Sequence, residues 1–260
     1  DNTMIKKIIS IIAIALVAAN ALHAEESLVA QAAKAYDADK FDVALDLYNQ
    51  AAATQGTSDA LFYNIGNCHY RLGNLGKAIV NYERALRLNP ANEEARTNVK
   101  FVKEKAGVVD SNEGSYILGW FSEQIESMPT DTWAWIAGLS FFLAIVGAMV
   151  YVGLNSVMLR KIGFFGGLIL LVISIFSLLA AIHTRNLFNH YNYAVVVTPS
   201  VTLSTSPRTP KDKSEEAFLL SEGYKVEVLD SVRSESQHWY EVRTDSEHRA
   251  WIEAKNIEKI

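Results

Sequence analysis

The hydropathy pattern of the chain is dominated by two long stretches that contain no Asp, Glu, Lys or Arg. They cover residues 132–159 and 162–184, and only Arg160 and Lys161 separate them. Each stretch is longer than the roughly 20 apolar residues with which a helix crosses a hydrocarbon core of about 30 Å. The pattern predicts a transmembrane helical hairpin over residues 132–184, with a short cytoplasmic loop at Arg160 and Lys161. Since a hairpin returns the chain to its starting side, both soluble flanks should share one face of the lipid bilayer.

The N-terminal pattern is that of a secretory signal peptide over residues 1–24. Two lysines precede an apolar stretch at residues 8–19, and small residues follow. Cleavage after Ala21 or after Ala24 fits this layout, and residues 1–3 form a short N-terminal extension. An uncleaved anchor helix is the alternative. Export would keep both soluble flanks outside the cytoplasm and the basic loop of the hairpin inside it, as the positive-inside rule favours.

A second pattern repeats every 34 residues before the hairpin. Small and aromatic residues return at this offset, and Ala44, Tyr48 and Ala51 recur as Ala78, Tyr82 and Ala85. A 34-residue period is typical of tetratricopeptide repeats, in which each unit is a pair of antiparallel helices. The second copy, residues 62–90, resembles that family closely, and residues 92–105 have the polar character of a capping helix. We therefore expect an all-α tetratricopeptide stack with its cap over residues 25–106.

The first helix of each repeat is expected to line a concave groove that binds a partner. In the second unit this helix presents the candidates Tyr63, Asn64, Asn67, Tyr70 and Arg71. Amides can hydrogen-bond a peptide backbone, Arg can bind a carboxylate, and Tyr offers contact area at low entropic cost. The alternative is that these are ordinary solvated repeat residues. Relatives that clamp a C-terminal carboxylate carry basic residues where this chain has Val29 and Ala33, so we predict no such clamp.

Residues 107–131 link the stack to the hairpin. The apolar run at residues 116–121 is followed by polar residues, which favours an amphipathic helix at the membrane interface over a disordered linker.

The second apolar stretch carries a GxxxG pair, Gly163 and Gly167. Small residues let helices approach closely, so we expect these glycines to pack within the hairpin, with recognition of a partner helix as the alternative.

The pattern changes to short alternating runs in residues 190–260. The runs at 223–229, 239–243 and 250–252 predict antiparallel strands joined by polar turns. Their order resembles that of bacterial SH3-like domains, although Ala250 stands where many relatives have Gly. The resemblance implies a small all-β SH3-like barrel whose rim aromatics bind a peptide or a protein segment. The rim candidates are Tyr224, Trp239, Tyr240 and Trp251, and the alternative places them in the core.

Composition and chemistry narrow the functional classes. The net charge of −5 offers no concentrated basic surface, so nucleic acid is not an expected partner. The single cysteine, Cys68, cannot form an internal disulfide, and its place in a repeat helix favours burial. The sequence has no catalytic constellation, no phosphate-binding Gly loop and no metal motif. We expect a protein that is not an enzyme and needs no cofactor or metal.

The order of these parts resembles the BatE-type proteins of the Bacteroides aerotolerance operon. That resemblance implies a multi-domain protein of the bacterial inner membrane, with two spans and soluble domains that face the periplasm. It also implies partner membrane proteins with von Willebrand A domains and a role in aerotolerance or envelope stress. The expected function is a membrane-anchored periplasmic scaffold that binds partner proteins through its repeats and its SH3-like domain. The alternative is an envelope sensor or a component that binds peptidoglycan through the SH3-like domain.

Overall fold

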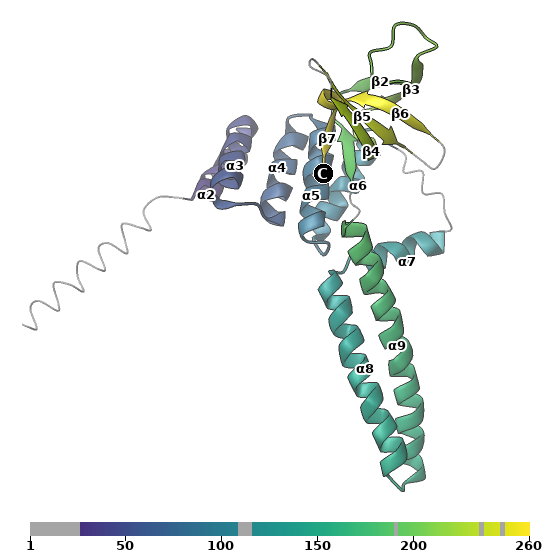
Figure 1. Ribbon diagram of the computed structural model, residues 1–260. Coiled ribbons are helices and arrows are strands. Elements are labelled where there is room, and N and C mark those ends of the chain that lie inside the picture. The colour runs from purple at the N-terminus through teal and green to yellow at the C-terminus, as the bar shows by residue number, and fades with distance from the viewer. Residues whose placement is uncertain (1–26, 109–115, 190–191, 234–236, 245–247) are drawn as a thin grey trace, which may run out of the picture.

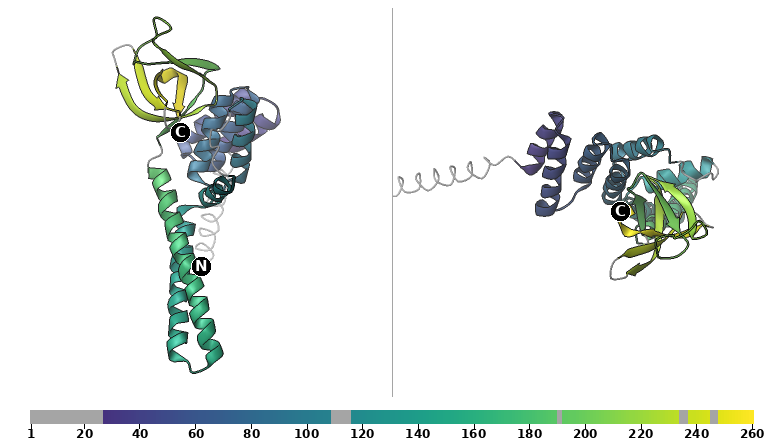
Figure 2. Two further views of the ribbon diagram at one scale, coloured as in Figure 1. Left: turned by 90° about the vertical axis from the view of Figure 1, so that its right-hand side faces the viewer. Right: turned by 90° about the horizontal axis from the view of Figure 1, so that it is seen from above.

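The computed structural model describes residues 27–108, 116–189, 192–233, 237–244 and 248–260 (Figure 1). A helical stack and an antiparallel sheet lie together at one end of a long helical hairpin, and Figure 2 shows this arrangement from two further directions. The predicted signal peptide lies outside the described residues.

The stack confirms the predicted all-α architecture before the hairpin. Its helices are α2 (Leu28–Asp37), α3 (Phe41–Gln55), α4 (Asp59–Arg71), α5 (Leu75–Leu88) and α6 (Glu93–Lys105). The first helix of each unit begins with a side-chain cap, because Ser27, Ser58 and Asn92 each accept a hydrogen bond from a backbone N–H three residues on. The capping helix predicted at residues 92–105 is therefore α6, with Asn92 as its N-cap.

The repeat residues pack as their sizes predict. Tyr82 is 1% exposed and lies against Gly66, where an added Cβ would be 2.7 Å from the Tyr82 ring. Ala78 and Ala85 are fully buried. Cys68 is also fully buried, as expected, and burial raises the pKa of its thiol to about 11.

The hairpin consists of α8 (Thr130–Gly153) and α9 (Val157–Asn189), and α7 (Tyr116–Glu126) precedes it. Both α8 and α9 are long and apolar enough to cross a membrane. The predicted position of the loop is wrong, because the chain turns at residues 154–156 and Arg160 and Lys161 lie in the first turns of α9. The physical reason is visible at Arg160, whose Nε donates to the carbonyl oxygen of Tyr151 at 3.1 Å. Arg160 thus lies in α9, outside the turn, and its side chain hydrogen-bonds a backbone carbonyl group near the C-terminus of α8.

The glycines of the hairpin pack within it, as predicted. An added Cβ at Gly163 would lie 2.6 Å from the carbonyl oxygen of Gly147, and one at Gly147 would lie 2.8 Å from that of Gly163. Gly167 faces the same crossing, where an added Cβ would lie 3.3 Å from the Ala144 carbonyl oxygen. Small residues at this crossing allow the two backbones to touch.

The C-terminal part is an all-β sheet, as predicted, but it is not a closed barrel. Its strands are β1 (Tyr193–Val196), β2 (Ser200–Ser204), β3 (Glu216–Ser221), β4 (Lys225–Arg233), β5 (His238–Arg243), β6 (Arg249–Glu253) and β7 (Ile257–Lys259). They pair in the order β3-β2-β6-β5-β4-β1-β7, and each pairing is antiparallel. Because β7 pairs with β1 and not with β3, these two strands remain the edges of the sheet.

Strand β1 is buried on both of its faces. Ala194 and Val196 belong to the core of the sheet, whereas Val195 packs into the core formed by α5 and α6. Successive side chains of a strand point to opposite faces, so a strand covered on both sides is a continuous apolar run. This explains the unbroken run of small and β-branched residues at 194–197.

Candidate functional site

The contact between stack and sheet determines which surfaces remain for a partner. It is centred on Gly76 of α5, whose backbone N–H donates to Oε1 of Glu222 at 2.8 Å. A Cβ at Gly76 would lie 2.4 Å from the carbonyl oxygen of Val196. On the sheet side, Gly223 has a φ of 88° and an added Cβ there would lie 2.8 Å from Ile79. At these two glycines the stack and the sheet therefore approach so closely that no larger side chain fits.

Charged side chains of α5 extend this contact toward the C-terminus. Arg84 pairs with Glu258 at 2.7 Å and also donates to the backbone carbonyl of Lys259. Arg87 donates to the carbonyl oxygen of Ile260 at 2.9 Å. Stack and sheet thus form one unit that is joined through α5, and none of the five repeat candidates takes part in these hydrogen bonds and ion pairs.

Asn67 is engaged inside the stack. Its Oδ1 accepts hydrogen bonds from the hydroxyl of Tyr82 at 2.7 Å and from Nδ2 of Asn98 at 3.1 Å. Burial raises the pKa of the Tyr82 hydroxyl, which keeps it a donor. Tyr63 also packs on Tyr82, with ring centroids 5.9 Å apart. Asn67 and Tyr63 therefore support the helix packing, and Asn64 beside them is half-buried.

Tyr70 belongs to an aromatic and basic cluster between α4 and α6. Its ring lies 5.9 Å from that of Phe101, and its hydroxyl accepts a hydrogen bond from Nζ of Lys105 at 3.2 Å. Phe101 is 53% exposed, although Phe is a costly residue to leave in water. We call Tyr70, Phe101 and Lys105 the α4–α6 cluster. Tyr70 was predicted from the sequence, whereas Phe101 and Lys105 were not. An alignment of α6 with the first helix of a repeat would have identified both.

Arg71 points to the other side of α4, toward the first repeat. It pairs with Asp39 at 2.9 Å, and its guanidinium carbon lies 4.0 Å from the centroid of the Phe41 ring. These contacts fasten the second unit to the turn of the first. The structure therefore separates Arg71 from Tyr70 and does not bring all five repeat candidates onto one open surface.

The four sheet candidates lie in or against packed regions. Trp239 is 6% exposed, and its Nε1 donates to Oε1 of Gln237 at 3.2 Å. Tyr224 and Tyr240 are half-buried and pack against the core of the sheet, and Nζ of Lys259 lies 4.5 Å from the Tyr240 ring. Trp251 is half-buried on β6.

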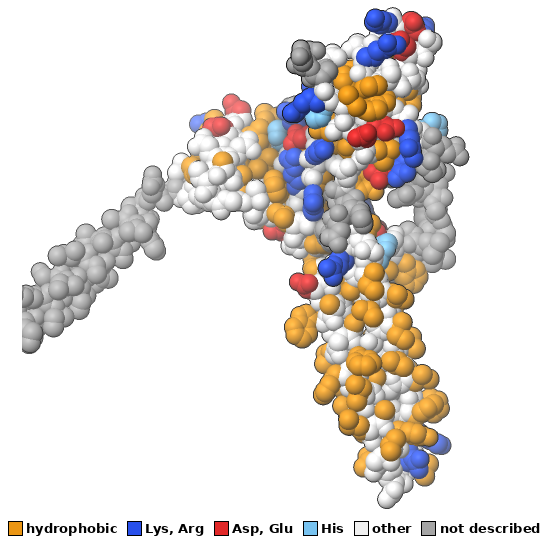
Figure 3. Space-filling model, viewed as in Figure 1, with side chains coloured by type: hydrophobic (Ala, Val, Ile, Leu, Met, Phe, Trp, Pro, Cys, Tyr) orange, Lys and Arg blue, Asp and Glu red, His pale blue; other side chains and the backbone are white. Residues whose placement is uncertain are grey.

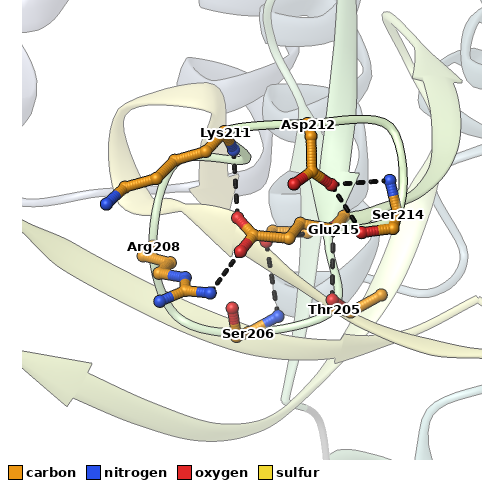
Figure 4. Close-up of polar contacts among 8 residues, drawn as sticks. Thr205, Ser206, Arg208, Lys211, Asp212, Ser214 and Glu215 are labelled. Atoms are coloured by element: carbon orange, nitrogen blue, oxygen red, sulfur yellow. Dashed lines mark hydrogen bonds and ion pairs between the residues drawn. The ribbon is translucent and has the colours of Figure 1, made fainter.

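The loop between β2 and β3 is held by a set of hydrogen bonds and an ion pair that was not predicted from the sequence (Figure 4). The Glu215 carboxylate accepts the backbone N–H of Lys211 at 3.0 Å and pairs with Arg208. Asp212 accepts the backbone N–H of Ser214 at 2.9 Å, and the hydrogen bonds from Ser214 lower the pKa of the Asp212 carboxyl. Asp two residues before Ser is a turn signal that was available in the sequence. Within the described ranges, no group of three or more His, Cys, Asp or Glu could hold a metal ion.

Comparison with known proteins concerns the repeats. The tetratricopeptide repeat family model matches residues 60–92. Proteins named tetratricopeptide repeat protein 16 from Macaca fascicularis and Homo sapiens are each 38% identical over 61 residues, which is 24% of this chain and 7% of theirs. The protein of that name from Mus musculus is 32% identical over 85 residues, which is 32% of this chain and 11% of its own. The chain thus spans about a tenth or less of these relatives, and the match indicates a protein-interaction scaffold.

Proposed function

We propose that this protein is a membrane-anchored scaffold that binds partner proteins through its repeats, at the periplasmic face of a bacterial inner membrane. The observation that carries the proposal is the position of the sheet. It covers the outer side of α5 through Gly76 and Arg84 and leaves the α4–α6 cluster open, with Phe101 53% exposed.

The surface of the hairpin supports the anchoring. Large apolar side chains are exposed along its length, including Phe142 at 61%, Met149 at 66% and Val172 at 61%. Figure 3 shows hydrophobic side chains along the whole length of this side of the hairpin, with charged side chains only toward its ends. Such a surface is unfavourable in water and matches lipid. The 24 residues of α8 span about 36 Å at 1.5 Å per residue, enough for a hydrocarbon core of about 30 Å.

Helix α7 is proposed to lie at the membrane interface. It crosses the end of the hairpin nearest the stack (Figure 1). Trp133 at the start of α8 donates from Nε1 to the carbonyl oxygen of Ile125 at 3.0 Å, and Glu123 of α7 pairs with Lys100 of α6. These contacts connect stack, α7 and hairpin at the level where an aromatic belt would form.

The repeats are preferred over the sheet as the main recognition element. Trp239 is buried, and Tyr224 and Tyr240 pack against the core, so these aromatics have little free surface for a ligand. The alternative, an envelope sensor or a peptidoglycan-binding component that acts through the SH3-like sheet, therefore has weaker support. The resemblance to BatE-type proteins suggests membrane proteins with von Willebrand A domains as partners, in an aerotolerance or envelope-stress complex.

The partner-binding proposal can be tested by cross-linking the full chain in its native membrane and identifying what is captured. Phe101→Ser should abolish capture of a specific partner, because Phe101 is the exposed part of the α4–α6 cluster. Val43→Ser is a matched control, since Val43 is 45% exposed on α3, and it should retain the partner. Leu219→Ser on β3, where Leu219 is 63% exposed, tests the alternative. Loss of partners from Leu219→Ser alone would assign recognition to the sheet and overturn the proposal.

The proposed orientation has its own test. An alkaline phosphatase fused after Ile260 should be active if that end is periplasmic. An inactive fusion with a folded, membrane-bound chain would contradict the orientation.

A further inference from the structure

The far end of the hairpin carries a pocket that the scaffold function does not use. Its volume is about 270 Å³, and it lies between the last turn of α8 and the first turns of α9. It is lined by Tyr151, Val157, Arg160, Lys161, Phe164 and Phe165. The pocket therefore combines two cations with an apolar and aromatic wall.

The two cations are not neutralised by the protein. Arg160 and Lys161 are the only charged residues between positions 132 and 184. Both are exposed, and neither forms an ion pair with any residue in the described part of the chain. Figure 3 shows basic side chains near the free end of the hairpin. A pair of exposed positive charges beside an apolar wall is available to attract a counter-charge from outside the chain.

Arg160 is held in place for such a counter-charge. Its Nε donates to the carbonyl oxygen of Tyr151 at 3.1 Å, and its guanidinium carbon lies 5.2 Å from the centroid of the Tyr151 ring. This bond uses one of the five N–H donors of the guanidinium and leaves four. Fixed guanidinium donors match the oxygens of a phosphate, which they bind in a bidentate manner.

The wall is also preassembled. The ring centroids of Tyr151 and Phe164 are 5.5 Å apart, and those of Phe164 and Phe165 are 5.2 Å apart. Val157 and Phe165 are nonetheless 69% and 59% exposed. These apolar side chains can contact acyl carbons next to a phosphate that is bound by the two cations. A phospholipid has this arrangement at the boundary between its headgroup and its acyl chains.

We propose that this pocket binds an anionic phospholipid, with the phosphodiester between Arg160 and Lys161 and the first acyl carbons against the aromatic wall. The inference rests on the proposed membrane crossing, because only then does the pocket lie at a headgroup layer. Its consequence is that the turn of the hairpin prefers a leaflet rich in anionic lipid.

The test is native mass spectrometry of the full chain in detergent, titrated with dioleoyl phosphatidylglycerol or dioleoyl phosphatidylcholine. The wild type should bind phosphatidylglycerol at least tenfold more tightly. Lys161→Gln should weaken that binding about fivefold, and Arg160→Gln with Lys161→Gln should remove the preference. Because Arg160 also supports the end of α8, Lys161→Gln is the cleaner variant. Arg185→Gln, at the opposite end of the hairpin, should change nothing.

Two results would overturn the lipid site. One is equal affinity of the wild type for both lipids, and the other is an unchanged preference in the double variant. Displacement of phosphatidylglycerol by millimolar glycerol phosphate would assign the pocket to a soluble phosphate instead. Retention of the chain in phosphatidylcholine vesicles after alkaline carbonate extraction separates the two proposals. A retained chain without lipid preference refutes the pocket alone, whereas an extracted chain refutes the membrane anchor as well.

Discussion

The carboxylate of Glu83 on α5 lies 3.0 Å from the ammonium group of Lys225 on β4, across the contact between stack and sheet. The same carboxylate lies 3.3 Å from Lys103 on α6. The Glu83 side chain is only 10% exposed, so one acidic group connects three elements in a largely dry environment.

Replacing Glu83 by Gln should destabilise the soluble unit by about 2–4 kcal/mol, because Lys103 and Lys225 would be left partly buried without their counter-charge. The measurement is urea unfolding of the full chain in detergent. Glu104→Gln on α6 is the control, since Glu104 is exposed and charges at the surface contribute little, about 0–1 kcal/mol. Equal losses for the two variants would show that the Glu83 contact does not join the domains.

Gly76→Ala should also weaken the contact of stack and sheet. Alanine favours a helix over glycine by about 1 kcal/mol, yet its Cβ would lie 2.4 Å from the Val196 carbonyl oxygen and force β1 away. We expect a net loss of about 1–3 kcal/mol in the same unfolding measurement. Lys77→Ala, at the exposed neighbouring position of α5, should be nearly neutral. A more stable Gly76→Ala protein would contradict the close approach.

Gly163→Val should separate α8 from α9. The new Cβ would lie 2.6 Å from the carbonyl oxygen of Gly147, whereas Gly166 three residues later has nothing within 4 Å of its Cβ position. Gly163→Val should lower the thermal midpoint of the hairpin in detergent, with a loss of about 1–3 kcal/mol, and Gly166→Val should not. Similar midpoints for the two variants would refute the glycine crossing.

His69 should make stability depend on pH. Its Nδ1 is buried and has no hydrogen-bond partner among the residues that the structure describes, and burial, with Lys77 nearby, lowers the pKa of the imidazole from 6.5 to about 4. The unfolded chain therefore takes up this proton first, and stability should fall as pH decreases from about 6.5 to about 4. The loss should approach 3 kcal/mol, at about 1.4 kcal/mol per pH unit.

The check is the free energy of unfolding at pH 7, 5.5 and 4 for wild type and His69→Gln. Gln does not titrate, so the variant should lose this pH dependence. Asp59 is a separate contributor, since hydrogen bonds from Asn89 lower the pKa of its carboxyl below the ordinary 3.8 and its effect appears only under more acidic conditions. Parallel pH profiles above pH 4 would exclude His69 as the cause.

Local patterns in the sequence predicted the elements well. The 34-residue offset located α2 to α6, because small residues such as Ala78 are required wherever the helices of each repeat cross. The charge-free runs located the hairpin but misplaced its turn, since a cation such as Arg160 can lie in a helix end and bond to the neighbouring helix. The closed barrel was wrong because closure depends on which distant strands pair, and β7 pairs with β1.

The packing of the sheet against the stack was not predicted, although a difference between the two repeats indicates it. Asp42 and Asp46 in the first unit become Gly76 and Val80 in the second, at the same 34-residue offset. The two aspartates are exposed, whereas Gly76 and Val80 are buried. A comparison of the two repeats therefore indicates that the outer face of α5 is covered, but it does not identify the element that covers it. Of the α4–α6 cluster only Tyr70 was predicted, although Phe101 and Lys105 stand 34 residues after the candidates Asn67 and Arg71.

Strand β1 has a consequence for the order of synthesis. Val195 completes the apolar cluster around α5, yet the two helices that we propose to cross the membrane are made between them. If the second helix fails to return, β1 is left on the wrong side of the bilayer and the outer face of α5 stays uncovered. Exposed apolar surface marks a chain for proteolysis. Under the proposed topology, the contact between stack and sheet would form only in a chain whose two membrane helices are both inserted.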